Sequence, residues 1–346
     1  MLPSARLGDD SVALMVGVGT DTLRVDMEPL LRVENLVMEF PGPRGTTIHA
    51  VSDVSFDVME RETLGIVGES GCGKSTTAKA IIQIPPPTSG SVRYQDRELT
   101  ELGKEALRET RTDLQMIFQD PISALNPRRS VWDIIREGVE IWDTHGTWTE
   151  ARLIELLESV GIDPQYRDRK PFQFSGGQSQ RIGIARALAL DPKVLISDEP
   201  VSALDVSVQA QILNLLEDLK VEHQLTMLFI SHDLAVVRNV SDRVMVMYLG
   251  RVAEIGNADS IFDNPAHPYT QALLSAVPGS GISDDGSLGG ELPSALDPPS
   301  GCRFHTRCAF ATEVCITTVP AFQRFGEDHF VACHHPQATP VEISTN

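Results

Sequence analysis

The residues with the clearest chemical meaning lie at positions 68–76, where the chain reads Gly-Glu-Ser-Gly-Cys-Gly-Lys-Ser-Thr. This stretch matches G-x-x-x-x-G-K-[ST], a loop whose backbone N–H groups turn inward around phosphate oxygens. The pattern assigns Lys74 to the β- and γ-phosphates and Ser75 to Mg²⁺. The residues expected to contact ATP are Gly68, Ser70, Gly71, Gly73, Lys74, Ser75 and Thr76.

The segment at residues 194–199 supplies the acids that such a site needs. It reads Val-Leu-Ile-Ser-Asp-Glu, an apolar strand that ends in two carboxylates. Asp198 is expected to bind Mg²⁺, and Glu199 is expected to face the attacking water. Acids at a strand end are often merely solvated, but their pairing with the phosphate loop favours hydrolysis of the nucleotide over passive binding.

Residues 174–181, Phe-Ser-Gly-Gly-Gln-Ser-Gln-Arg, resemble the signature motif of the ATP-binding-cassette (ABC) ATPases. In that family the motif contacts the γ-phosphate held by the opposite subunit, so each ATP lies between two cassettes. Phe174 and Ser179 depart from the commonest form of the motif, and neither change removes a phosphate-binding group. The resemblance implies a role on the partner's nucleotide for Ser175, Gly177 and Gln178.

Other family elements follow in the expected order. Gln119 matches the glutamine that links the nucleotide's metal to a helical subdomain, and the resemblance makes it a metal ligand and a catalytic residue with Glu199 and His232. Asp205 closes a Ser-Ala-Leu-Asp loop, and His232 matches the histidine near the γ-phosphate. Phe40 stands where the family places an aromatic ring against adenine, although a core position is the alternative.

The resemblance extends to one branch of the family. Residues 118–128, 198–207 and 264–270 look like the ATPase subunits of oligopeptide/dipeptide importers, and residues 291–302 look like the extension of the F-type subunit. This implies a second, D-type ATPase, two membrane permeases and an extracellular peptide-binding protein. Other solutes, such as nickel or glutathione, are alternatives. So are a soluble ABC protein of translation or DNA repair and a metal-sensing ATPase.

Cysteines cluster near the C-terminus with the spacing C-x5-C-x6-C-x17-C, formed by Cys302, Cys308, Cys315 and Cys333. The spacing lacks the C-x2-C pair that is usual in structural zinc sites. Four thiolates can hold a [4Fe–4S] cluster, and extensions of the resembling subfamily can carry one. Zinc and free thiols are the alternatives, and Cys72 is assigned to packing in the phosphate loop.

Composition limits the remaining classes. The chain of 346 residues carries a net charge of −19, which argues against a nucleic-acid partner and fits either a salt-adapted or an ordinary acidic protein. No apolar run reaches the ~18 residues that a membrane span needs. The apolar run at residues 12–18 has no basic leader, so no signal peptide is expected. A peripheral place at the cytoplasmic face of the membrane follows from these features together with the resemblance.

The pattern of strands and helices that must position these residues predicts an α/β protein. Alternating strands and helices predict a largely parallel sheet with both faces covered. We expect a mobile leader at residues 1–29 and a P-loop NTPase cassette at 30–262, with a RecA-like core and an antiparallel β subdomain. A helical subdomain is expected at about 99–189. Residues 263–346 form the cysteine-containing extension, with a Gly-, Ser- and Asp-rich linker at 279–290.

Overall fold

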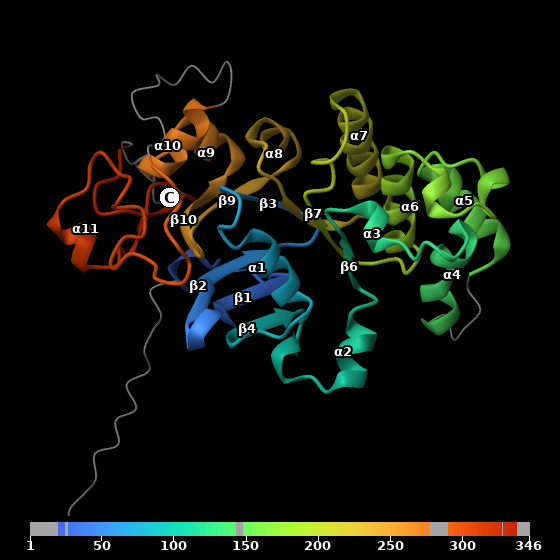
Figure 1. Cartoon of the computed structure of the whole chain (residues 1–346), viewed down its shortest axis with the longest axis horizontal. Helices are drawn as coiled ribbons and strands as arrows, with labels where there is room; N and C mark the ends of the chain where they lie inside the picture. Colours follow the sequence, from blue (N-terminus) through green and yellow to red (C-terminus); the bar gives the residue numbers. More distant parts are fainter. Residues whose placement is uncertain (1–19, 25–26, 143–147, 277–289, 327, 338–346) are drawn as a thin grey trace, which may run out of the picture.

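The computed structural model describes residues 20–24, 27–142, 148–276, 290–326 and 328–337 (Figure 1). Most of the expected leader and nearly all of the expected linker therefore lie outside the described residues. Within these ranges, no helix is both long enough and apolar enough to cross a membrane.

The larger sheet has eight strands in the order β11-β12-β10-β9-β3-β8-β7-β6. Pairing is parallel from β9 through β3, β8 and β7 to β6, and antiparallel from β9 through β10 and β12 to β11. The strands are β3 (Thr63–Val67), β6 (Leu114–Ile117), β7 (Val194–Asp198), β8 (Thr226–Ile230), β9 (Arg243–Tyr248), β10 (Arg251–Asn257), β11 (Phe322–Arg324) and β12 (Phe330–Ala332).

Every residue of β3, β7, β8 and β9 is buried, which explains why these strands read as continuous apolar runs. Alternate side chains enter two separate cores, because successive side chains in a strand point to opposite faces. Ile66 and Ile196 pack on the side of the smaller sheet, whereas Val67 and Leu195 pack against helices on the other side. The sheet is therefore covered on both faces, as the alternation of elements predicts.

The smaller sheet is antiparallel, in the order β2-β1-β4-β5, as expected from residue 31 onward. Helix α1 (Lys74–Ile81) lies between the two sheets and contacts β1, β2, β7 and β8 (Figure 1). The strands are β1 (Leu31–Pro41), β2 (Thr47–Val58), β4 (Ser89–Tyr94) and β5 (Arg97–Glu98).

The opposite face of the larger sheet is covered by helices that follow its strands. They share the core that contains Val67 and Leu195, and α8 packs directly on β3. The helices are α7 (Val206–His223), α8 (Leu234–Val240), α9 (Ala258–Asp263) and α10 (Pro268–Ser275).

The expected helical subdomain is present, but it begins later than predicted. Residues Leu114–Ile117 form β6 and pair in parallel with β7, so this part of the expected range belongs to the core sheet. Beyond β6, Leu153, Leu156 and Leu157 of α5 are buried, as the periodicity indicates. The helices of the expected range are α2 (Lys104–Thr110), α3 (Pro121–Ala124), α4 (Val131–Trp142), α5 (Glu150–Ser159) and α6 (Gly176–Leu188).

Short 3₁₀ helices connect several of these elements. They are η1 (Thr20–Thr22), η2 (Pro43–Gly45), η3 (Leu99–Glu101), η4 (Pro164–Tyr166) and η5 (Pro171–Gln173).

The C-terminal extension shares the core sheet. Its strands β12 and β11 continue the sheet from β10, and α11 (Glu313–Thr317) lies at the far end of the molecule (Figure 1). The fully buried carboxylate of Glu254 on β10 accepts hydrogen bonds from the backbone N–H groups of Ala266 (2.7 Å) and His267 (3.0 Å). It also lies 2.7 Å from Nε2 of His329. Glu254 therefore joins the extension to the core.

A buried ionic group attaches the end of the expected leader to the core. Arg24 contacts Asp57 (2.7 Å) and Glu62 (2.6 Å), and Arg243 reaches the same two carboxylates at 3.1 Å each. The Arg243 side chain is 3% exposed and that of Asp57 is fully buried, so each charge depends on its partners. Residues 20–24 are thus held against the sheet, which differs from the free leader expected from the sequence.

Removing the central cation of this group should destabilise the fold. We expect Arg243→Met to lower the free energy of unfolding by about 3 kcal/mol, because it leaves buried carboxylates short of a partner. The matched control is Arg238→Met, whose pair with Asp263 joins side chains that are 50% and 61% exposed and should matter by only about 0–1 kcal/mol. Thermal or urea unfolding of the two variants measures the difference, and equal losses would contradict the assignment.

Candidate nucleotide site

The phosphate loop connects β3 to α1, and two of its glycines are required by close backbone contacts. Gly68 has φ +150°, and a Cβ there would lie 2.2 Å from the carbonyl oxygen of Met247. Gly73 has φ +107°, and its Cβ would lie 2.5 Å from the carbonyl oxygen of Ala50. A larger residue at either position would displace the loop from the strands beneath it.

Lys74 and Ser75 open α1 at the bottom of this loop. The Lys74 side chain is 5% exposed, and its Nζ donates to the carbonyl oxygens of Gly68 (2.8 Å) and Glu69 (3.0 Å). A buried ammonium is thus centred in the loop, where a polyanion would be bound. The N-terminal end of α1 adds partial positive charge at the same place.

Ser75 meets Asp198 at the carboxyl end of β7. Its Oγ donates to Oδ1 of Asp198 at 2.6 Å, and burial raises the pKa of that carboxyl group. Mg²⁺ prefers oxygen ligands and is usually held by one or two carboxylates together with phosphate oxygens. The hydroxyl and the carboxylate therefore fit an Mg²⁺ ion that arrives with a nucleotide.

Glu199 is held between the two other residues predicted to act in catalysis. Gln119 donates from Nε2 to Oε2 of Glu199 at 2.9 Å, and Nδ1 of His232 lies 3.4 Å from Oε1. The backbone of Glu199 has φ +47°, a region that L-residues seldom adopt, and its N–H donates to the carbonyl oxygen of Ile230 at 2.9 Å. Such strain is typical of functional positions.

Lys74, Ser75, Gln119, Glu199 and His232 line one cavity of about 470 Å³, a size that suits a small-molecule ligand, whereas Gly68 and Asp198 are not part of its lining. Sequence reasoning missed part of the lining: Ile48 and Ala50 come from β2, and Ala295 comes from the extension. The signal that could have indicated the two β2 residues was their position in a strand of the predicted antiparallel β subdomain. The full lining is Ile48, Ala50, Ser70, Gly71, Gly73, Lys74, Ser75, Thr76, Gln119, Glu199, His232 and Ala295.

Phe40 does not line this cavity. Its backbone pairs with Ile48 across β1 and β2, and its side chain packs against the core of the smaller sheet. The contact to adenine that the resemblance implies for Phe40 stays a prediction, and its cross-strand neighbour Ile48 lines the cavity.

The signature residues lie apart from the chain's own phosphate loop. Ser175 caps α6 by accepting a hydrogen bond from the N–H of Gln178 (3.3 Å), whose side chain accepts one from the N–H of Ser175 (3.0 Å). A Cβ on Gly177 would lie 2.5 Å from Cγ1 of Val208, so only glycine allows α6 to approach α7. None of the three lines the cavity, nor does Asp205, the N-cap residue of α7.

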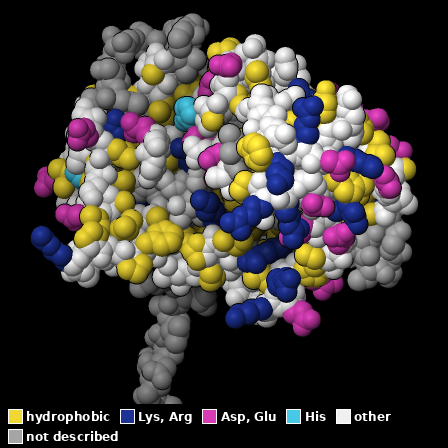
Figure 2. All heavy atoms as spheres, turned by 45° about the vertical axis from the view of Figure 1, so that its right-hand side comes forward, with side chains coloured by type: hydrophobic (Ala, Val, Ile, Leu, Met, Phe, Trp, Pro, Cys, Tyr) yellow, Lys and Arg dark blue, Asp and Glu magenta, His cyan; other side chains and the backbone are white. Residues whose placement is uncertain are grey.

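Charge on the molecular surface is unevenly distributed. Although the chain carries a net charge of −19, Lys and Arg side chains gather across the middle of the face shown in Figure 2. A local group of cations lowers the cost of bringing a polyanion to an acidic protein.

All four clustered cysteines are free thiols in the structure. Burial raises the pKa of Cys302 and Cys308, and it raises that of Cys333 to about 12. Among the described residues, no group of three or more His, Cys, Asp or Glu side chains is placed so that it could hold a metal ion. As placed here, the thiols do not form the metal centre that the resemblance implies for these four cysteines.

Two family models match the chain. The model described as "ABC transporter" matches residues 51–202, and the model described as "Oligopeptide/dipeptide transporter, C-terminal region" matches residues 253–315. The second match includes all but the first two residues of β10, together with α9, α10 and the first three of the clustered cysteines.

Several relatives are similar over nearly their whole length. The oligopeptide transport ATP-binding protein AppF of Bacillus subtilis is 48% identical over 325 residues, which cover 89% of this chain and 98% of AppF. The oligopeptide transport ATP-binding protein OppF of Haemophilus influenzae is 49% identical, with 90% and 98% covered. The di/tripeptide transport ATP-binding protein DppF of Pseudomonas aeruginosa is 46% identical, with 90% and 99% covered.

Solved structures agree with the cassette fold. The dimeric bacterial ABC transporter cassette MJ0796 aligns with a TM-score of 0.60 at 28% identity, covering 66% of this chain and 98% of that one. The residues that surround the phosphate loop, the signature held apart from it and these likenesses agree: the chain belongs to the ATP-hydrolysing ATP-binding subunits of ABC transporters, in the oligopeptide/dipeptide branch.

Proposed function

We propose that this chain is the ATP-hydrolysing subunit that powers the import of di- and oligopeptides, bound to membrane permeases at the cytoplasmic face. The observation that carries the proposal is the position of Glu199, which Gln119 and His232 hold at the edge of the phosphate-loop cavity. The peptide substrate is supported by the names of the relatives, which cover this chain at 46–49% identity.

The residues of the loop bind and orient the triphosphate. Lys74 and the N-terminal end of α1 supply positive charge, while Ser75 and Asp198 provide the oxygen ligands for the metal. When bound with the nucleotide, Mg²⁺ would neutralise part of the charge that develops during phosphoryl transfer.

Glu199 is the proposed general base. Its carboxylate orients a water molecule and accepts its proton as the water attacks the γ-phosphorus and the bond to the leaving ADP oxygen breaks. Gln119 and His232 keep the carboxylate in place, because each contacts a different oxygen of it.

Ser175, Gly177 and Gln178 are proposed to act on the nucleotide of a second ATPase subunit. The start of α6 presents the Ser175 hydroxyl and the backbone N–H groups of the two glycines that follow it, an arrangement that suits an anion. Its separation from the cavity of its own chain supports a site shared between two subunits. Closure of such a dimer on ATP, and its opening after hydrolysis, would move the helical subdomain against the permeases.

The proposed partners are a D-type ATPase paralogue, two permeases and an extracellular peptide-binding protein. They are supported by the oligopeptide/dipeptide C-terminal match and by the peptide-transport names of the relatives. Stimulation of the ATPase of the assembled transporter by peptide-loaded binding protein, and not by nickel or glutathione, would test the substrate class.

Replacing the proposed base should stop hydrolysis without preventing binding. We expect Glu199→Gln to lower kcat by about 100-fold or more, because general-base catalysis typically contributes ~10²–10⁴-fold. The affinity for MgATP should be retained, since the amide keeps the shape of the side chain. The control Glu217→Gln alters an exposed carboxylate of α7. Phosphate release and nucleotide binding measure the two effects, and undiminished turnover in Glu199→Gln would refute the role.

A change at the signature should act on the partner. We expect Ser175→Ala to bind MgATP as the wild type does when the chain is alone, because the side chain does not line the cavity. Hydrolysis by the assembled transporter should fall by about 10-fold or more, in line with the loss of a donor to developing charge. Ser175→Gly checks that a lost helix cap is not responsible, since glycine caps nearly as well, and Ser159→Ala is the control. A loss of ATP affinity in the isolated Ser175→Ala chain would contradict a shared site.

The [4Fe–4S] cluster is proposed for the C-terminal cysteines on the chemistry of the donor set. Burial, and after it the nearby Cys302, Cys308 and Cys315, raise the pKa of the Cys333 thiol, so the four cysteines lie in one neighbourhood. The N–H of His335 donates to the sulfur of Cys333 at 3.3 Å. To bind a cluster, the four thiols would have to lose their protons and lie closer together than they do in the structure.

Metal analysis decides this proposal. Protein purified without oxygen should contain ~4 iron atoms and an equal amount of acid-labile sulfide per chain. Cys333→Ser should lose the iron, whereas Cys72→Ala, which removes the cysteine of the phosphate loop, should keep it. Stoichiometric zinc, or the absence of any metal, would refute the cluster.

A further inference from the structure

Glu69 is the second residue of the phosphate loop, and its N–H, its carbonyl oxygen and its carboxylate each make a hydrogen bond. Its N–H donates to the hydroxyl of Tyr269 at 2.9 Å, and its carbonyl oxygen accepts from Nζ of Lys74 at 3.0 Å. Its carboxylate accepts from both terminal nitrogens of Arg307, at 2.6 and 3.1 Å. Two of these three contacts come from residues beyond position 263, the expected start of the extension.

The carboxylate of Glu69 is an electrostatic problem for a loop that binds polyphosphate. An uncompensated negative charge on this loop would repel the nucleotide, and the repulsion is strong where water is partly excluded. Arg307 forms a bidentate pair with it, and the arginine side chain is only 5% exposed. The ion pair raises the pKa of the guanidinium still further, so the compensating charge is permanent.

Arg307 is itself held by an aromatic group that belongs partly to the core and partly to the extension. Its Nη1 lies 3.5 Å from the hydroxyl of Tyr248, which ends β9. The ring of Tyr248 packs edge-on against those of Tyr269 and Phe304, with centroids 4.7 and 5.2 Å apart. These contacts fix the direction from which Arg307 approaches the loop.

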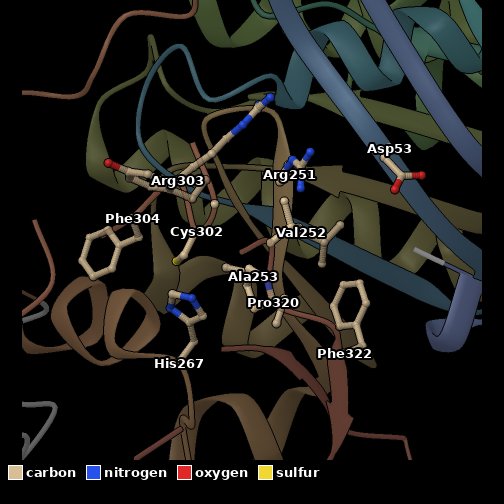
Figure 3. Close-up of a pocket in the computed structure, with 14 residues that line it drawn as sticks. Asp53, Arg251, Val252, Ala253, His267, Cys302, Arg303, Phe304, Pro320 and Phe322 are labelled. Atoms are coloured by element: carbon tan, nitrogen blue, oxygen red, sulfur yellow. The ribbon is translucent and has the colours of Figure 1, made fainter. Parts of the chain in front are cut away.

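A second arginine of the segment at 302–308, Arg303, also forms hydrogen bonds with the core. Arg303 donates to the carbonyl oxygen of Leu249 and to Oγ of Ser52 (2.9 Å). The next residue after Leu249 is Gly250, whose N–H donates to the carbonyl oxygen of Cys72 in the phosphate loop at 2.7 Å. Figure 3 shows a second pocket, which Cys302, Arg303, Phe304 and His267 help to line; there the Arg303 side chain points away from His267, whereas Cys302 and Phe304 lie close to it. The segment at 302–308 thus has a cysteine at each end and two arginines between them, of which Arg307 contacts the phosphate loop and Arg303 contacts the neighbouring turn.

We propose that the C-terminal extension positions the phosphate loop for ATP, with Arg307 as the positioning residue that neutralises Glu69 and holds it away from the phosphates. The proposal rests on the proposed nucleotide site and adds a determinant of its affinity that lies 238 residues along the chain from Glu69. Arg307 does not line the cavity, so it acts on the nucleotide only through Glu69.

The test compares four proteins as full-length chains: wild type, Arg307→Met, Glu69→Gln and the double variant. We expect Arg307→Met to weaken MgATP binding by about 10-fold, within the ~5–150-fold that coupled sites typically show. The double variant should recover most of the affinity, because the repelling carboxylate is gone. Arg307→Lys should recover part of it, since lysine keeps the charge but not the bidentate geometry.

Two further measurements distinguish positioning from a general loss of stability. The defect of Arg307→Met should shrink as salt is raised, because ions screen the repulsion between Glu69 and the phosphates. The control Arg324→Met removes another arginine of the extension, one whose Nε donates to the carbonyl oxygen of Gly326, and should leave ATP affinity unchanged. Thermal unfolding confirms that each variant is folded at the assay temperature.

The outcomes separate this inference from the function on which it rests. If the wild type binds MgATP but Arg307→Met binds it equally well, the inference is overturned and the nucleotide site stands. A double variant as weak as Arg307→Met would also overturn it, because the defect would not pass through Glu69. If the wild type itself fails to bind MgATP, the proposed function fails first.

Discussion

The hydrogen bond between Ser75 and Asp198 is possible only because β3 and β7 run parallel on either side of β8. Parallel strands end at the same edge of a sheet, so the loop after β3 and the acids after β7 meet there. Strand β8 ends at that edge as well, which brings His232 to Glu199. The strand order therefore places the catalytic groups before any side chain makes its own contacts.

The same arrangement leaves the signature residues outside the described nucleotide cavity of their own chain. The start of α6 lies at the base of the helical subdomain, where Ser175 and Gly177 are held by a capping box and by the close contact with α7. These contacts make the signature rigid but keep it away from the cavity of its own chain. A rigid donor set that has no ligand of its own suits recognition of a nucleotide presented by another subunit.

Local motifs predicted the centre of the site, because Lys74, Ser75, Asp198 and Glu199 are carried by patterns only a few residues long. The β-strand alternation likewise predicted the two sheets, since buried parallel strands read as continuous apolar runs. Phe40 was assigned by its position within a resemblance; its ring packs on the core of the smaller sheet while its cross-strand neighbour Ile48 lines the cavity, so its contact to adenine stays a prediction. An aromatic residue near the end of a strand can pack on the core or face a ligand, and the sequence does not choose between them.

Contacts between distant segments could not be read from the sequence. Arg24 resembles any residue of an unpatterned leader, yet it shares two buried carboxylates with Arg243. Glu254 lies in an ordinary strand, but its carboxylate makes hydrogen-bond contacts with three residues of the extension: Ala266, His267 and His329. In each case one partner is a charged residue that would usually be solvated, and only the fold supplies the other.

The extension consequently has to be considered part of the catalytic fold. Its strands β11 and β12 lengthen the core sheet, and Ala295 contributes to the lining of the nucleotide cavity. The loop and residues 302–308 are joined by the bidentate contact of Arg307 with Glu69, so the conformation of this part of the extension and that of the loop depend on each other.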